Sequence, residues 1–345
     1  MKRWLATGVV LVLLVFGAGA VGLLHVRDFL RTPLTVDANG ALFEVRSGAS
    51  FAEISELLGS RGITSNSTLL RWYARWTNEA SKVQAGEYLI KPGTTPVALL
   101  HQFTTGAVQL YSFTLIEGWN HRELLHALQQ HPEVAGTMED ADWPDLLSEL
   151  GAATDAPEGL FLPETYRFPR ATTDRKVLAQ AYSLMQSVLN EEWSARAKDA
   201  PVNSPYEALI LASIIEKETG RADERQRISG VFARRLAKNM RLQTDPTVIY
   251  GIGATFDGNL TRNDLRTDTV YNTYTRGGLP PTPIAMPGRA SIHAALHPAP
   301  GNELYFVATG LGDGSHYFSV THEEHEKAVQ RYLRQLRNTS NRSQE

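Results

Sequence analysis

The distribution of apolar residues separates a charge-free N-terminal stretch from a longer remainder of mixed pattern. From Trp4 to Leu24 the chain carries no charged residue over 21 positions. A helix of this length, rising about 1.5 Å per residue, spans about 32 Å, which matches a hydrocarbon core of about 30 Å. The pattern predicts that residues 1–30 form a short tail and one membrane-spanning anchor.

The charges around this stretch predict its orientation. Lys2 and Arg3 precede it, and the leading tail is short, so we expect the N-terminus inside and residues 31–345 outside. The alternative is a cleaved signal peptide, because Ala18-Gly19-Ala20 is similar to a cleavage site, although this apolar stretch exceeds the usual length of about 7–15 residues. Both interpretations export the rest of the chain across a membrane.

Residues 31–108 are predicted to form a linker and a small strand–helix–helix–strand subdomain. Alternating residues at 42–45 and 86–90 indicate two strands. Ser50 and Glu53 form a capping box for the first helix between them. In the second helix, Trp72 and Trp76 are four positions apart, a spacing that favours a stripe facing the core over a platform for stacking sugars.

Residues 109–338 mix strands with helices and are predicted to form a larger domain, followed by a frayed tail at 339–345. Apolar positions recur with a helical period over 174–199. Segments 303–309 and 316–320 flank a Gly-rich turn and predict a hairpin. We therefore expect an α+β fold with two β-containing parts behind the anchor.

Composition excludes several functions. The chain has 34 Lys and Arg against 37 Asp and Glu, a net charge of −3, and no Cys. This balance gives no reason to expect a nucleic-acid partner, and cysteine chemistry is impossible. Serine-hydrolase, P-loop and zincin motifs are absent from the sequence. His322 and His325 follow Thr321 and Glu324, a capping box, so we interpret them as helix residues and predict no metal or cofactor.

One helix carries the candidate for catalysis. Ser204 with Glu207 predicts a helix that begins at Pro205, and its last acidic residue, Glu218, shares a face with Ile214 and Ile215. Apolar surroundings and the negative end of the helix dipole both raise the pKa of a carboxyl group. Glu218 is therefore a candidate general acid, and the structural alternative is pairing with a nearby arginine.

Glu216 is the second choice for the acid. It lies about 200° around the same helix from Glu218, so it replaces Glu218 only if the predicted helix phase is wrong.

Long blocks of the sequence resemble the YceG-like (MltG) family of endolytic murein transglycosylases. The blocks are EGLFLPETYRFP (158–169), ALILASIIEKETG (208–220), RLQTDPTVIYG (241–251), YNTYTRGGLPPTPIAMPG (271–288) and AALHPAPGNELYFVATGLGDGSHYFS (294–319). The resemblance implies a single-pass protein of the inner membrane, with a LysM-like subdomain at 31–108 and an extracytoplasmic catalytic domain at 109–338. The glutamate followed by Ser or Thr in such helices corresponds to Glu218, which precedes Thr219.

The resemblance also implies the reaction and the partners. The family is described as cutting the MurNAc-β-1,4-GlcNAc bond inside nascent peptidoglycan strands, leaving 1,6-anhydro-MurNAc ends, beside penicillin-binding synthases whose strand elongation it terminates. One glutamate acts first as acid and then as base, and no cofactor is needed. Residues of these blocks that are candidates for substrate contact are Glu164, Gln243, Thr244, Asp245, Tyr250, Asn272 and Tyr274.

Two other functions stay open from the sequence. A muramidase that hydrolyses the same bond needs a second carboxyl about 5–9 Å from the acid, for which Glu164 and Asp245 are candidates. A glycan-binding scaffold for cell-wall synthases would need no acid, and the candidate contact residues would then have only structural roles.

Overall fold

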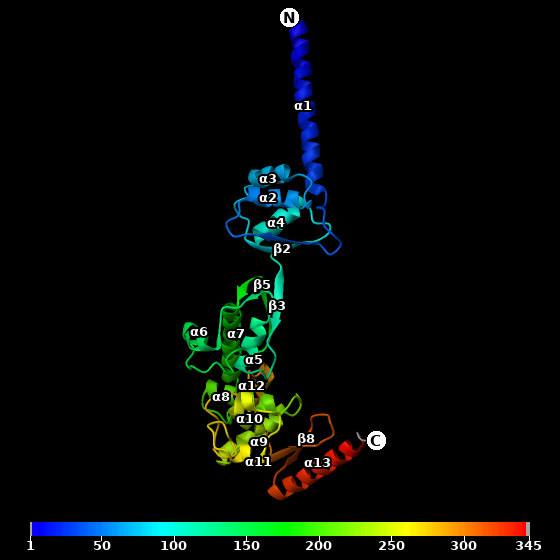
Figure 1. Ribbon diagram of the computed structural model, residues 1–345. Helices are drawn as coiled ribbons and strands as arrows, with labels where there is room; N and C mark the ends of the chain where they lie inside the picture. Colours follow the sequence, from blue (N-terminus) through cyan, green and yellow to red (C-terminus); the bar gives the residue numbers. More distant parts are fainter. Residues whose placement is uncertain (1, 343–345) are drawn as a thin grey trace. The chain divides into compact units, whose positions relative to one another are not determined.

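The computed structural model describes the backbone of residues 2–342 and the side chains of residues 13, 14 and 16–337. The chain forms two compact units (Figure 1). Unit 1 comprises Met1–Tyr111 with Arg167–Ala171, and unit 2 comprises Ser112–Tyr166 with Thr172–Glu345. Both combine helices with strands, so the mixed α+β class expected from the sequence is found.

Unit 1 has the predicted strand–helix–helix–strand order, with a further helix after the second strand. Its elements are α1 (Lys2–Arg31), β1 (Ala41–Val45), α2 (Phe51–Ser60), α3 (Ser67–Trp76), β2 (Gly86–Ile90) and α4 (Pro96–Thr105). Strands β1 and β2 pair antiparallel with Phe43 opposite Tyr88. Both rings are fully buried and pack against Phe103 of α4, so the core of the unit lies between the sheet and this helix.

Helix α1 contains the predicted membrane-spanning segment. Side chains of residues 4–12 and 15 within that segment lie outside the described residues. Large apolar side chains further along the helix are exposed: Leu13, Leu14, Phe16, Val21, Leu23 and Leu24. No helix in the described part of the chain combines the length and the apolar content needed to span a membrane. The anchor therefore stays a prediction.

Helix α3 does not face the core in the way its spacing suggested. Trp72 and Trp76 are 54% and 70% exposed, whereas Leu70 and Ala74 are buried. The prediction of a tryptophan stripe in the core is wrong. Residues 70 and 74 form a competing pair with the same four-residue spacing, about 200° around the helix from 72 and 76, and that pair packs into the core.

Unit 2 contains most of the helices and short, paired strands. Its elements, of which β3 and β5 extend into unit 1, are β3 (Leu110–Thr114), α5 (His121–Gln129), β4 (Val134–Ala135), η1 (Asp140–Asp142), α6 (Trp143–Glu149), β5 (Thr165–Pro169), β6 (Thr172–Thr173), α7 (Asp174–Ser194), α8 (Pro205–Glu218), α9 (Arg225–Ala237), α10 (Asp245–Ile252), η2 (Gly253–Thr255), α11 (Arg262–Arg266), α12 (Arg289–Leu296), β7 (Tyr305–Ala308), β8 (His316–Ser319) and α13 (His322–Arg342). Strand β3 pairs with β5, β4 runs parallel to β6, and β7 and β8 form the predicted hairpin.

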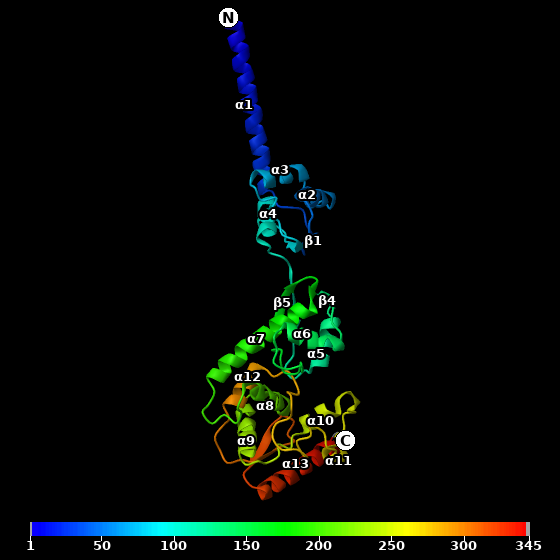
Figure 2. The same cartoon turned by 90° about the vertical axis from the view of Figure 1, so that its left-hand side faces the viewer.

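Helix α8 is the centre of unit 2. Its residues from Ala208 to Ile215 are all buried, and α7, α9, α10 and α12 pack around it (Figure 2). The helix begins as predicted, because Ser204 accepts a hydrogen bond from the Glu207 N–H at 3.1 Å and Pro205 occupies the first turn. An apolar helix surrounded in this way carries its terminal residue, Glu218, to the inner wall of a cleft.

Candidate active site

Glu218 is the last residue of α8 and lies in a cleft of about 560 Å³. Side chains from distant parts of unit 2 line this cleft: Glu218, Arg235, Leu242, Gln243, Asp245, Tyr274, Tyr305, Phe306, Val307, Ala308, His316, His322, His325, Val329 and Tyr332. They come from α8, α9, α10, the β7–β8 hairpin, α13 and the segments between them. The cleft thus places two carboxyl groups, those of Glu218 and Asp245, among aromatic, amide and cationic side chains.

The surroundings of Glu218 change its acidity. Desolvation is the largest cause of a rise in its pKa from 4.5 to about 7, and the nearby Asp245 carboxylate raises it further. A hydrogen bond from Thr244 and the positive charge of Arg235 act in the opposite direction. Near neutral pH the carboxyl group is therefore found in both protonation states, which is what a group that first donates and then accepts a proton needs.

A cluster of buried threonines holds the carboxyl group in place. The Thr244 hydroxyl donates a hydrogen bond to Glu218 Oε1. The Thr244 N–H donates to Thr273 Oγ1 at 3.1 Å, and the Thr247 hydroxyl donates to the Thr244 carbonyl at 2.8 Å. Gln243 adopts a φ of 51°, in the left-handed region that is unfavourable for residues other than glycine. These contacts set the turn that brings Thr244 to Glu218.

Asp245 and Tyr274 form a second polar pair in the cleft. The Tyr274 hydroxyl donates to Asp245 Oδ1 at 2.5 Å. Burial is the main cause of a raised Tyr274 pKa, and the Asp245 carboxylate adds to it. The tyrosine therefore stays a neutral hydrogen-bond donor. Of the residues predicted for substrate contact, Gln243, Asp245 and Tyr274 line the Glu218 cleft. Thr244 contacts Glu218 without lining the cleft.

Sequence reasoning missed Arg235, a buried cation in the same cleft. Its Nε donates to the Leu304 carbonyl at 2.6 Å and its Nη1 to the Leu242 carbonyl at 2.7 Å. Desolvation lowers its pKa, although a guanidinium stays charged. Arg235 shares a face of α9 with the buried residues Val231 and Phe232. An arginine on an apolar helix face was the signal that could have identified it.

The cleft also receives histidines from the C-terminal part of the chain. His322 and His325 lie in the first turns of α13 and line the cleft with Tyr305 of β7. The rings of Tyr305 and His325 stack with centroids 5.2 Å apart. Burial lowers the pKa of His325. The capping box predicts these histidines only as helix residues, and their position at the cleft depends on how the β7–β8 hairpin packs against α13.

Two predicted contact residues lie elsewhere. Tyr250 lines a separate cleft of about 930 Å³, where its hydroxyl donates to Glu158 Oε2 at 3.0 Å. Burial and the negative charge of Glu158 raise the Tyr250 pKa. Glu164 is exposed next to β5 and accepts a hydrogen bond from the Thr165 N–H at 2.9 Å. Neither side chain lines the Glu218 cleft.

Asn272 is buried and hydrogen-bonded to main-chain groups rather than turned to the cleft. Its Nδ2 donates to the carbonyls of residues 264, 265 and 267 at 3.2, 3.2 and 2.7 Å, and its Oδ1 accepts from the Tyr274 N–H at 2.8 Å. The amide thus holds the loop that carries Tyr274. It supports the cleft through the backbone instead of lining it.

Glu216 is also engaged away from the cleft. Its Oε2 accepts a hydrogen bond from the Gly288 N–H at 2.9 Å, and its Oε1 lies 3.7 Å from Arg225 Nη2. This is the geometry that the difference of about 200° between positions 216 and 218 predicts. The helix phase assumed from the sequence is therefore the phase found, and it leaves Glu218 as the acidic residue of α8 in the cleft.

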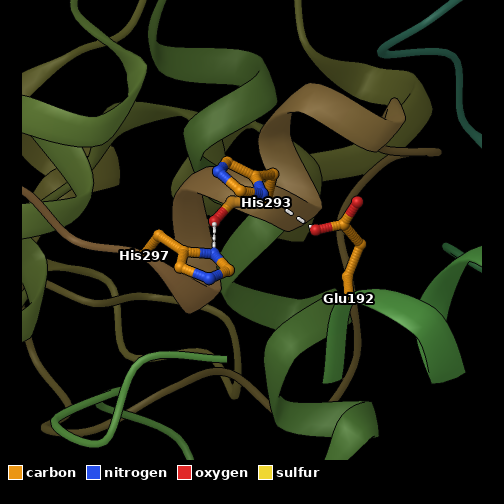
Figure 3. A group of neighbouring side chains, drawn as sticks. All are labelled: Glu192, His293 and His297. Carbon is orange, nitrogen blue, oxygen red and sulfur yellow. Dashed lines mark hydrogen bonds and ion pairs between the residues drawn. The ribbon is translucent and has the colours of Figure 1, made fainter. Parts of the chain in front are cut away.

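Three residues outside the cleft could hold a metal ion. Ligand atoms of Glu192 on α7 and of His293 and His297 on α12 and at its end lie within 4.8 Å of one another (Figure 3). Glu192 already accepts from Arg289 Nε and bonds His293 Nδ1, both at 2.8 Å. The two ring nitrogens of His297 contact the carbonyls of His293 and Ala195 at 3.0 and 2.9 Å. Metal binding would break these contacts, which join α7 to α12.

Comparisons with known proteins identify relatives of this chain. The model of the YceG-like family matches residues 43–331. The chain is 31% identical to the endolytic murein transglycosylase of Bacillus subtilis, over 84% of each protein. It is 25% identical to the protein of the same name in Streptococcus pneumoniae, over 96% of this chain and 66% of that one. A crystal structure of a YceG-like protein from Listeria monocytogenes matches with a TM-score of 0.54 and 28% identity, over 84% of this chain and 99% of that chain.

Proposed function

We propose, since the chain belongs to the YceG-like family, that it is an endolytic murein transglycosylase, a lyase that cuts inside the glycan strands of peptidoglycan. The observation that carries this proposal is the position of Glu218, a desolvated carboxyl group with a pKa of about 7 in a cleft lined by aromatic and polar side chains. The relatives of this chain in Bacillus subtilis and Streptococcus pneumoniae are both named endolytic murein transglycosylase.

The proposed reaction needs one acid that becomes a base. Protonated Glu218 donates its proton to the bridging oxygen of the MurNAc-β-1,4-GlcNAc bond as the bond from that oxygen to the muramyl C1 breaks. The Glu218 carboxylate then takes the proton of the muramyl 6-hydroxyl, whose oxygen bonds to C1 and closes a 1,6-anhydro ring. No water is consumed. The attacking hydroxyl belongs to the substrate, so its effective concentration is high.

The other residues of the cleft have supporting roles in this proposal. The Asp245 carboxylate supplies a fixed negative charge for the oxocarbenium-like centre at C1. Gln243 and Tyr274 offer an amide and a ring with a polar tip for hydroxyl and N-acetyl groups of the glycan. Thr244 positions Glu218 through its hydroxyl, and Asn272 positions the loop of Tyr274.

A second candidate is a muramidase-type hydrolase. The observation in its favour is that Asp245, a second carboxyl group, lines the same cleft as Glu218. Two carboxyl groups allow one to activate water or form a covalent intermediate. The products separate the two functions, because hydrolysis leaves a reducing end. A scaffold without catalysis would not need a desolvated acid in the cleft.

We also propose where the enzyme acts. Residues 4–24 anchor it in the cytoplasmic (inner) membrane with the N-terminus inside, and residues 31–345 lie on the outer side. Residues 31–108 act as a LysM-like module for glycan strands. The enzyme works beside penicillin-binding synthases and ends strand elongation by cutting nascent strands. Support comes from the charge-free segment and from the exposed apolar side chains of α1.

The test is mass spectrometry of purified glycan strands after incubation with the full chain in detergent. Wild type and Glu216→Gln are expected to release fragments with 1,6-anhydro ends from internal positions, and Glu218→Gln is expected to leave the strands intact. Reducing ends would support the hydrolase. Activity that survives Glu218→Gln would overturn the site, and strands that wild type binds without cutting would support the scaffold.

A further inference from the structure

Two tryptophans on α3 expose a large apolar surface in unit 1. Trp72 and Trp76 are 54% and 70% exposed. Their rings lie parallel, with an interplanar angle of 2° and centroids 6.1 Å apart. Tryptophan carries the largest apolar side chain and is highly buried on average. Two of them side by side on one exposed helix face indicate a surface that is covered by a partner.

The position of this Trp72–Trp76 face within unit 1 suggests what covers it. Both views show α3 beside the C-terminal end of α1 (Figures 1 and 2). Phe29 of α1 and Leu70 and Ala74 of α3 belong to one buried core, so the two helices are held by the same packing. Leu24, five residues before Phe29, is 62% exposed, and that spacing is about 8 Å along a helix. The exposed apolar part of α1 therefore begins close to the level of α3.

An exposed arginine lies at this boundary on each of the two helices. Arg75 is exposed next to Trp76 on α3, and on α1 both Arg27 and Asp28 are exposed just after the apolar stretch. Tryptophan prefers the boundary between hydrocarbon and water, and arginines attract anionic headgroups. A glycan strand has no apolar surface as large as the one that Trp72 and Trp76 expose. It would also leave the exposed apolar side chains of α1 uncovered.

We propose that the Trp72–Trp76 face of α3 docks on the headgroup region of an anionic lipid bilayer beside α1. The inference rests on the proposed membrane anchor. Its consequence is that unit 1 is held against the membrane surface by two points, the end of α1 and the face of α3, instead of turning freely about one helix.

The test uses the full chain reconstituted in vesicles of phosphatidylcholine and phosphatidylglycerol, with either ordinary or brominated acyl chains. Every protein in the test carries Trp4→Phe. The fluorescence emission of the Trp72–Trp76 pair is obtained as the difference between the protein that keeps both tryptophans and its Trp72→Phe/Trp76→Phe variant. Brominated chains are expected to reduce this difference at least two-fold. Trp193, a half-buried residue of unit 2 over which Arg196 lies, is the matched control, and its contribution, measured with Trp193→Phe, is expected to stay the same.

Each other outcome overturns the inference. If the vesicles float with the protein but the emission of the pair is the same with both lipids, α3 does not touch the bilayer. If the protein does not float with the vesicles, the anchor fails and the docking fails with it. If glycan strands, and not brominated lipid, change the emission, the pair binds sugar. Cleavage of glycan strands is measured separately, and Trp72→Phe/Trp76→Phe is expected to keep it, so failure of the proposed activity is distinguishable.

Discussion

Replacing Thr244 with valine tests how the protein sets the acidity of Glu218. Valine has nearly the shape of threonine and lacks the hydroxyl that donates to Glu218 Oε1. That hydrogen bond lowers the Glu218 pKa against the larger effect of desolvation. Its removal leaves the carboxylate without this donor in a site that stays buried, so the Glu218 pKa is expected to rise.

The size of the change follows from the bond that is lost. A hydrogen bond to a charged group contributes about 1.5–3 kcal/mol, and one pKa unit corresponds to about 1.4 kcal/mol. The Glu218 pKa is therefore expected to move up by about 1–2 units, starting from about 7 in the wild type. Because the acid must be protonated to cleave the bond, activity is lost as pH rises through this value, and Thr244→Val retains activity to higher pH.

The assay is kcat/KM for release of anhydro ends from glycan strands, measured from pH 5 to 10, since this ratio reports ionisation of the free enzyme. The matched control is Thr247→Val. The Thr247 hydroxyl donates to the Thr244 carbonyl at 2.8 Å, so the control disturbs the same buried cluster and keeps the hydroxyl of Thr244. Its alkaline midpoint is expected to equal that of the wild type.

Two results would refute the reasoning. The first is a folded Thr244→Val protein whose alkaline midpoint is unchanged or lower. The second is an equal shift in Thr244→Val and Thr247→Val, because a general disturbance of the cluster would then explain both.

Three further predictions concern stability and the choice of acid. The pKa of Glu218 rises from 4.5 to about 7 on folding, so between these pH values the folded state binds a proton that the unfolded state has lost, and the stability of the wild type falls as pH rises. In urea unfolding, the free energy of unfolding of Glu218→Gln is therefore expected to increase relative to that of the wild type by up to about 3 kcal/mol between pH 4 and pH 8. A difference between the two proteins that does not depend on pH would contradict the shift. Glu216→Gln loses its charge beside Arg225 and is expected to unfold about 1–3 kcal/mol more easily while it keeps the wild-type products; loss of cleavage in the folded variant would return Glu216 as the acid. Asn272→Ala removes a buried amide that bonds four main-chain groups and is expected to cost about 2–4 kcal/mol in the same unfolding assay, whereas an unchanged midpoint would mean that water replaces the amide.

Local features of the chain were predictable because they depend on neighbours in sequence. The capping residues Ser204 and Ser50 and the helices that follow them are found where the sequence places them. The separation of Glu216 from Glu218 is likewise a matter of helix geometry, about 100° per residue. Interactions within one turn of a helix do not depend on the rest of the fold, so the sequence alone is enough to predict these parts of the site.

The Trp72 and Trp76 prediction failed for a physical reason. The apolar residues of α3 cover one wide arc of the helix, with Trp72 and Trp76 toward one edge of the arc and Leu70 and Ala74 toward the other. The face that is buried, Leu70 and Ala74, is the one that meets the rest of the unit 1 core, including Phe29 of α1. A sequence pattern describes which faces of a helix can be buried, and packing against other elements selects one of them.

Which residues line the Glu218 cleft depends even more on contacts between residues that are distant in sequence. Tyr250 and Tyr274 both lie within blocks that resemble the family, yet Tyr274 lines the Glu218 cleft and Tyr250 lines another. Arg235 is held in the cleft by a hydrogen bond to the carbonyl of Leu304, 69 positions away in the sequence. The sequence predicts Glu218 as the candidate acid, because its surroundings on its own helix already disfavour its charge. The residues around Glu218 are specified by the fold, because chain segments far apart in sequence meet only when the whole of unit 2 packs around α8.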